Sequence, residues 1–76
     1  MSRLPRVSAI EVIRVLEKIG FTLARQSGSH KIYKNAAGLR ATVPYHGSII
    51  LKPKTFKSIL NDAGLTIDEF IDHLND

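Results

Sequence analysis

The sequence predicts an α+β fold: one helix, then a three-stranded antiparallel sheet, then a second helix and a short C-terminal helix. Apolar residues recur with a helical period in residues 8–19 and again after residue 53, whereas residues 21–44 alternate with a period of two. The 76 residues are enough for one domain (1–76) with a small core. Residues 1–7 are a basic N-terminal extension to which the sequence assigns no role.

The first helix is predicted to begin after Ser8. Ser8 and Glu11 match the capping box, in which each side chain accepts a hydrogen bond from the other residue's backbone N–H. Gly20 is the expected end of this helix, because glycine readily adopts the left-handed conformation that helix ends require. The apolar face consists of Val12, Ile13, Val15, Leu16 and Ile19.

The sheet is predicted to begin with a hairpin whose tight turn is at residues 27–29, where Gly28 supplies a positive φ. The face that the middle strand turns to the helices is left open by the sequence. If Ile32 faces the helices, alternation sends Lys31 and Tyr33 to the open face. His30 then points toward the helix side, at the rim of the sheet, but the opposite arrangement fits equally well. The three strands are expected within residues 21–26, 30–35 and 39–43.

Two helices are expected after the sheet. Pro53 suits the first turn of the second helix, where its missing N–H costs nothing, and Gly64 is expected to end that helix. Thr66 and Glu69 repeat the capping-box pattern and begin the last helix. The inward residues are Phe56, Ile59, Leu60 and Ala63 in the second helix, and Ile67, Phe70, Ile71 and Leu74 in the last.

The charge is distributed unevenly along the chain. Residues 1–60 hold all 11 lysines and arginines but only two acids, a net charge of +9, and residues 61–76 hold the other five acids, a net charge of −5. So basic a segment favours a polyanion such as nucleic acid as the partner. A solvated basic surface without such a partner would have the same composition.

Cysteine content and hydropathy indicate the compartment. The chain has no cysteine, which excludes disulfides and thiolate zinc sites and favours a reducing compartment, hence the cytoplasm. No apolar run approaches the roughly 18 residues that a membrane-spanning helix needs. We therefore expect neither export nor contact with a membrane.

Histidines supply the candidate catalytic groups. His30 directly follows the hairpin turn, next to Lys31 and close to Lys34, and an imidazole can accept and donate protons near neutral pH. A histidine among cations suggests phosphate chemistry, although a polar strand residue without a catalytic role would give the same pattern. His46, in the loop after the third strand, is a second candidate, and a solvated loop histidine explains it as well. No metal is expected, because the histidines lack ligand spacing and no cysteine completes a set.

The beginning of the second helix is electrostatically unusual. Lys52 and Lys54 flank Pro53, where the helix dipole favours anions and no Ser, Asp or Asn cap precedes. A bound phosphate would remove this conflict, because helix N-termini bind anions through their free N–H groups. A slightly unfavourable, solvated helix end is the alternative, since each mismatch costs only about 0.3 to 1 kcal/mol.

Four segments match, in order, a known family. They are Gly20-Phe21; Arg25 to Tyr33, with Gly28-Ser29-His30 at its centre; Thr42-Val43-Pro44-Tyr45-His46-Gly47; and residues 51–65, which begin Leu51-Lys52-Pro53-Lys54-Thr55. Together they resemble the HicA family, the small mRNA-cleaving toxins of HicAB toxin–antitoxin modules, and the likeness covers residues 8–74. The predicted order of elements is also that of a double-stranded-RNA-binding-like fold.

The resemblance implies that His30 is the catalytic histidine of an endoribonuclease, an mRNA interferase, that a HicB-like antitoxin binds and neutralises. Because RNA carries its own nucleophile, the 2′-hydroxyl, we expect metal-independent acid–base catalysis with no cofactor, helped by Lys31 or Lys52. Whether His46 makes the second proton transfer is left open. A non-catalytic RNA-binding module, or a basic docking surface for an acidic protein, is the alternative. The residues expected to contact RNA are Gly28, Ser29, Lys31, Lys34, Lys52 and Lys54.

Overall fold

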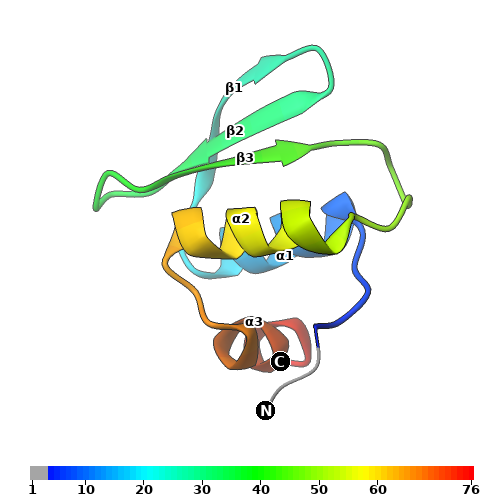
Figure 1. Ribbon diagram of the computed structural model, residues 1–76. Coiled ribbons are helices and arrows are strands. Elements are labelled where there is room, and N and C mark those ends of the chain that lie inside the picture. Colours follow the sequence, from blue (N-terminus) through cyan, green and yellow to red (C-terminus); the bar gives the residue numbers. More distant parts are fainter. Residues whose placement is uncertain (1–3) are drawn as a thin grey trace.

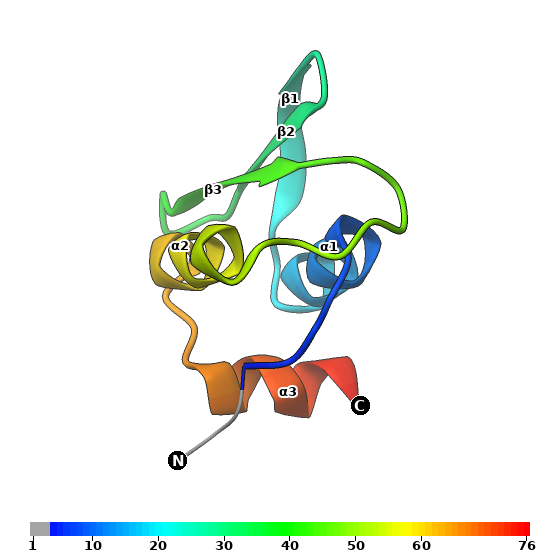
Figure 2. The same ribbon diagram turned by 45° about the vertical axis from the view of Figure 1, so that its right-hand side comes forward.

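The structure is a computed structural model in which residues 4–76 are described, and it has the predicted α+β architecture. Figure 1 shows three layers: the sheet, then α1 and α2, then α3. Turned by 45° in Figure 2, the two middle helices still lie on one side of the sheet, and none of the helices described covers its other side. The elements are α1 (Ala9–Lys18), β1 (Thr22–Ser27), β2 (His30–Lys34), β3 (Arg40–Pro44), α2 (Pro53–Ala63) and α3 (Ile67–Leu74).

The predicted capping box begins α1. The Ser8 N–H donates to Glu11 Oε1 at 3.0 Å, and the Glu11 N–H donates to Ser8 Oγ at 3.3 Å. At the other end Gly20 has a φ of 100°, and the Phe21 N–H donates to the Leu16 carbonyl at 2.9 Å. This hydrogen bond turns the chain back toward the sheet immediately after the helix.

The N-terminal extension is partly integrated into the core. Residues 1–3 lie outside the described part of the chain, but Val7 is buried, and its carbonyl accepts a hydrogen bond from the Leu51 N–H at 2.8 Å. Ser8 also forms an isolated antiparallel bridge with Ile50. The described end of the extension therefore fastens the loop that precedes α2.

The structure decides which face of β2 meets the helices. The strands pair in the order β1-β2-β3, both pairs antiparallel, and Tyr33, Ala41 and Val43 are buried against the helices. Ile32 therefore lies on the open face, so the alternative with Ile32 inside is wrong. A tyrosine ring contributes more apolar surface to a core than an isoleucine does, and Ala41, its cross-strand partner, leaves room for it. His30, two residues from Ile32, shares the open face and is exposed.

A β-bulge interrupts β1. Leu23 pairs with Tyr33, but Arg25 pairs with Ile32, so one residue, Ala24, has no partner of its own. Because paired residues share a face, Leu23 lies on the helix side and Arg25 on the open side. Every residue of β1 is exposed, since this strand extends past the helices.

Helix α3 forms the third layer by packing beneath the other two helices. The Phe70 ring meets the Phe56 ring of α2 edge to face, with centroids 4.8 Å apart, and both side chains are 1% exposed. Lys18 Nζ donates to the carbonyls of His73 and Asp76, each at 2.9 Å, and so ties the end of α1 to the end of α3. Within residues 4–76, no helix has the apolar length that crossing a bilayer requires.

Candidate active site

The turn between β1 and β2 holds His30 at one end of the sheet. Gly28 has a φ of 59°, which side-chain-bearing residues rarely adopt, and the Gln26 amide Nε2 donates to its carbonyl at 3.1 Å. The Tyr45 N–H donates to the Ser29 carbonyl at 2.6 Å. These bonds join the turn to the end of β3, so the backbone on both sides of His30 is held in place while its side chain remains exposed.

A pocket at the end of β3 contains two more of the predicted residues. It has a volume of about 260 Å³, and both His46 and Lys52 line it. Pro44, in the wall of this pocket, is the cross-strand partner of His30 in the sheet. The fold thus brings His30, His46 and Lys52 to the same end of the molecule. The full lining is Pro44, His46, Ile49, Ile50, Leu51, Lys52 and Thr55.

The beginning of α2 provides N–H donors at this pocket. Lys52 is the N-cap residue and its side chain makes no capping bond; the first bond of the helix runs from the Phe56 N–H to the Lys52 carbonyl at 3.0 Å. The N–H groups of Lys54 and Thr55 precede that bond, where a helix has no internal acceptors to offer. Two lysines and a helix N-terminus therefore create a positive potential beside the pocket.

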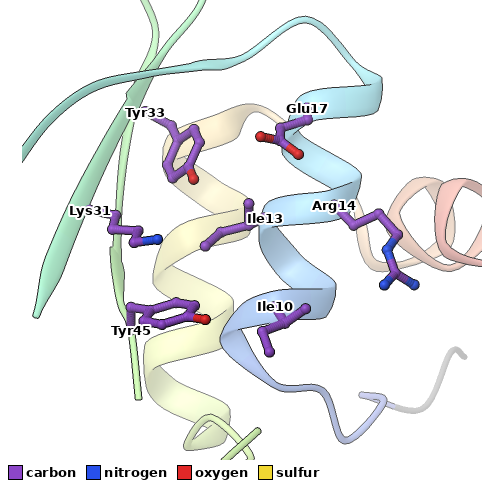
Figure 3. A pocket seen from close by; sticks show the side chains of 7 residues that line it. All are labelled: Ile10, Ile13, Arg14, Glu17, Lys31, Tyr33 and Tyr45. Atoms are coloured by element: carbon purple, nitrogen blue, oxygen red, sulfur yellow. The ribbon is translucent and has the colours of Figure 1, made fainter. Parts of the chain in front are cut away.

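Lys31 lies on the other side of the sheet from His30. Its Nζ sits 4.0 Å from the centre of the Tyr45 ring, a cation–π contact, within a groove between β2 and α1. Figure 3 shows Lys31 between Tyr33 and Tyr45, all three extending from the sheet toward α1. Of the two lysines expected to assist His30, Lys52 therefore lines the pocket that includes Pro44, whereas Lys31 lies in the groove on the helix side. This groove, of about 290 Å³, is lined by Ile10, Ile13, Arg14, Glu17, Lys31, Tyr33 and Tyr45.

The same groove perturbs a tyrosine. Burial raises the pKa of the Tyr33 phenol above its ordinary value of 10.0, and the nearby Glu17 carboxylate and Tyr45 raise it further. The hydroxyl is therefore neutral at physiological pH. It can donate a hydrogen bond to a partner, but it carries no negative charge.

The sequence reasoning missed two arginines on the face that carries His30. Lys34 lies on this open face as the register requires, and Arg40 is its cross-strand partner, while Arg25 reaches the same face because of the bulge. The alternation of β3, with Ala41 and Val43 inside, could have revealed Arg40. No signal in the sequence marks the bulge, so Arg25 could not have been placed.

No group of three or more His, Asp or Glu side chains within residues 4–76 is arranged to hold a metal ion.

No curated protein matches the chain at a significant level of similarity. A family model does: the one described as HicA toxin of bacterial toxin-antitoxin matches residues 9–65. The matched stretch begins with α1, includes the whole sheet and the pocket between His46 and Lys52, and ends just after α2. Because it spans well over half of the chain, the chain belongs to the HicA toxin family, the toxins of bacterial toxin–antitoxin systems.

Proposed function

We propose that this toxin is an endoribonuclease that cleaves mRNA, with His30 as the catalytic acid–base group. The observation that supports this most is the pairing of His30 with Pro44, because Pro44 lines the pocket that His46 and Lys52 also line. One end of the sheet thus holds two groups able to transfer protons and a cation for the phosphate. An mRNA substrate implies action in the cytoplasm.

The reaction needs two proton transfers and stabilisation of charge. His30 takes the proton of the 2′-hydroxyl, whose oxygen attacks the adjacent phosphorus; the bond from phosphorus to the 5′-oxygen breaks, and that oxygen receives a proton. His46 is the candidate donor for this second transfer. Lys52 and the N–H groups at the beginning of α2 stabilise the negative charge that builds up on the phosphate oxygens. General acid–base catalysis of this kind is worth roughly 10² to 10⁴ in rate.

The chemistry is tested by incubating the purified chain with a long single-stranded RNA in EDTA. We expect upstream fragments that end in a 2′,3′-cyclic phosphate or a 3′-phosphate, since attack by the 2′-hydroxyl produces these ends. Fragments with 3′-hydroxyl ends, or a requirement for metal, would exclude the mechanism. RNA that binds but stays intact would instead indicate a non-catalytic RNA-binding module, and absence of RNA binding a docking surface for an acidic protein.

A HicB-like antitoxin is the proposed partner. To neutralise the toxin it should cover the end of the sheet that holds His30 and place acidic or polar groups against Lys52 and Lys54. Cleavage should therefore stop when the complex forms, and these residues should become protected from solvent in hydrogen exchange. A stable complex that leaves them exposed and the cleavage rate unchanged would contradict direct blocking of the site.

A further inference from the structure

The open face of the sheet carries a cluster of positive charge that the proposed catalytic site does not use. The strand register places Arg25, Lys34 and Arg40 on this face, and all three side chains are exposed. Figures 1 and 2 show that no helix formed by residues 4–76 lies over it. We refer to the three as the sheet cations. Across the sheet, the rows on this face are Thr22, Lys34 and Arg40; Arg25, Ile32 and Thr42; and Ser27, His30 and Pro44.

Folding does not account for these charges. The segment from residue 21 to residue 52 contains no Asp or Glu, so no carboxylate neighbours the sheet cations within the sheet or its loops. Lys34 and Arg40 are also direct cross-strand partners, and like charges in that position destabilise a sheet. Within residues 4–76 none of the three forms an ion pair that would compensate.

The β-bulge is what completes the cluster. With regular alternation after Leu23, Arg25 would lie on the side of the helices, next to the buried core. The bulge at Ala24 turns it to the open face instead, one row from Lys34 and one row from His30. Bulges often serve to redirect a side chain near a functional site.

We propose that the open face binds the sugar-phosphate backbone of single-stranded RNA and that the sheet cations lead this strand across the sheet to His30. The inference rests on the proposed nuclease function and adds the path of the substrate. Lys34 and His30 are the two ends of β2 and lie on the same face. They are four positions apart along the strand, or roughly 13 Å at about 3.3 Å per residue. An RNA strand that runs from Lys34 and Arg40 to the histidine therefore passes the middle row of this face, which holds Arg25.

The composition of the face favours RNA over a protein. Protein interfaces depend on a buried apolar or aromatic centre, and this face offers only Ile32 apart from the rim residue Pro44. Arginine, lysine and hydroxyl side chains are the groups that most often contact phosphates and sugars. Thr22, Thr42 and Ser27 supply the hydroxyls here. The face therefore has the chemistry of a backbone-binding surface that does not read sequence.

The test measures binding and cleavage separately. Binding uses a single-stranded 2′-O-methyl RNA, which lacks the nucleophile and stays intact, over a range of salt concentrations. We expect Arg25→Ala and Arg40→Ala each to make the slope of log K against log salt shallower by about 0.7, and the double variant by about 1.4. At about 0.1 M salt this corresponds to roughly fivefold weaker binding for each arginine. Arg14→Ala is the matched control, because Arg14 is an exposed arginine on α1, outside the open face, and should leave the slope unchanged.

Cleavage of ordinary RNA distinguishes failure of this inference from failure of the proposed function. If the unmutated chain cuts RNA and the double variant keeps the original slope, the RNA does not follow the sheet cations and the inference is wrong. The open face would then be available for an acidic protein. If the unmutated chain neither binds nor cuts RNA, the proposed function itself is wrong and the inference falls with it. The inference is supported if the salt slope becomes shallower in the double variant and stays the same in Arg14→Ala.

Discussion

The open face of the sheet is basic and helix α3 is acidic, and the two lie at opposite ends of the molecule (Figure 1). The acid in the capping box of α3 serves the fold. Thr66 and Glu69 form a capping box at its beginning, where the helix dipole favours acids, and Lys18 donates to carbonyls at its end. The sheet cations have no such role, because no carboxylate lies near them in the sheet. The face that carries His30 therefore holds charge that folding does not explain.

The N-terminal ends of α2 and α3 differ in a similar way. The beginning of α3 is capped and acidic, whereas the beginning of α2 has no side-chain cap and is flanked by Lys52 and Lys54. Each mismatch of this kind costs about 0.3 to 1 kcal/mol. A phosphate bound there would reverse the sign of that contribution.

The largest expected effect is that of His30→Ala on cleavage, which should fall by roughly 10² to 10⁴ because a general acid or base is lost. The side chain is exposed, so the free energy of unfolding should change by less than about 1 kcal/mol. RNA binding should persist, since cations carry the phosphate affinity. Single-turnover cleavage assays and chemical denaturation provide the measurements.

His73→Ala is the matched control for this variant, because His73 lies on α3 at the far end of the molecule. It should leave cleavage unchanged. A His30→Ala protein that is folded and fully active would mean that another residue is the catalyst, and His46→Ala would then be the variant to measure first.

Phe70→Ala should show that α3 is structural. Truncating a buried phenylalanine typically costs about 3 to 5 kcal/mol, a large part of the stability of so small a domain. The midpoint of urea unfolding should fall accordingly, whereas Phe70→Leu, which keeps most of the apolar volume, should lose less. Cleavage per folded molecule should be retained in both variants. A loss of less than about 1 kcal/mol for Phe70→Ala would mean that the third layer contributes little to the fold.

The beginning of α2 should contribute directly to RNA binding. Lys52→Ala and Lys54→Ala should each make the salt slope shallower by about 0.7, the value for one phosphate contact on a single strand. Lys57→Ala serves as the control, because this exposed lysine follows the first turn of the same helix. If neither Lys52→Ala nor Lys54→Ala alters the slope, the phosphate binds somewhere other than this helix end.

The smallest expected effect is that of Thr66→Ala. Loss of the cap removes the acceptor for the Glu69 N–H, now bonded at 3.1 Å, and should cost about 1 kcal/mol of stability without changing RNA binding. Thermal unfolding measures the loss. Ser58→Ala, on the exposed surface of α2, should not lower the melting temperature. A Thr66→Ala variant that binds RNA more weakly would contradict the view that α3 serves only the fold and that RNA binds at the other end of the molecule.

Much of the fold follows from residues that are close together in the sequence. Ser8 with Glu11 and Thr66 with Glu69 predict the beginnings of α1 and α3, and both capping boxes are present. Gly64, with a φ of 73°, ends α2 as expected. Such signals depend on backbone groups three or four residues apart, so a single sequence is enough to read them.

Local sequence patterns predict only part of the candidate site. The sequence singled out His30, His46 and Lys52 one by one, but it could not show that they gather at one end of the sheet. Their proximity depends on the pairing of β2 with β3 and on the bond from the Tyr45 N–H to the Ser29 carbonyl. Contacts of this kind join segments that local patterns treat as independent.

The sequence by itself therefore determined the order of the elements and, to within one residue, the limits of the strands. It also determined the apolar faces of the three helices and the residue types available for chemistry. Only the tertiary structure decided which side of the sheet each of these residues occupies. Strand alternation allows two arrangements that differ by one residue, and the choice depends on how much apolar surface the core can bury. Burial of Tyr33 turned His30 outward and Lys31 toward α1, and the bulge at Ala24 brought Arg25 to the face of His30.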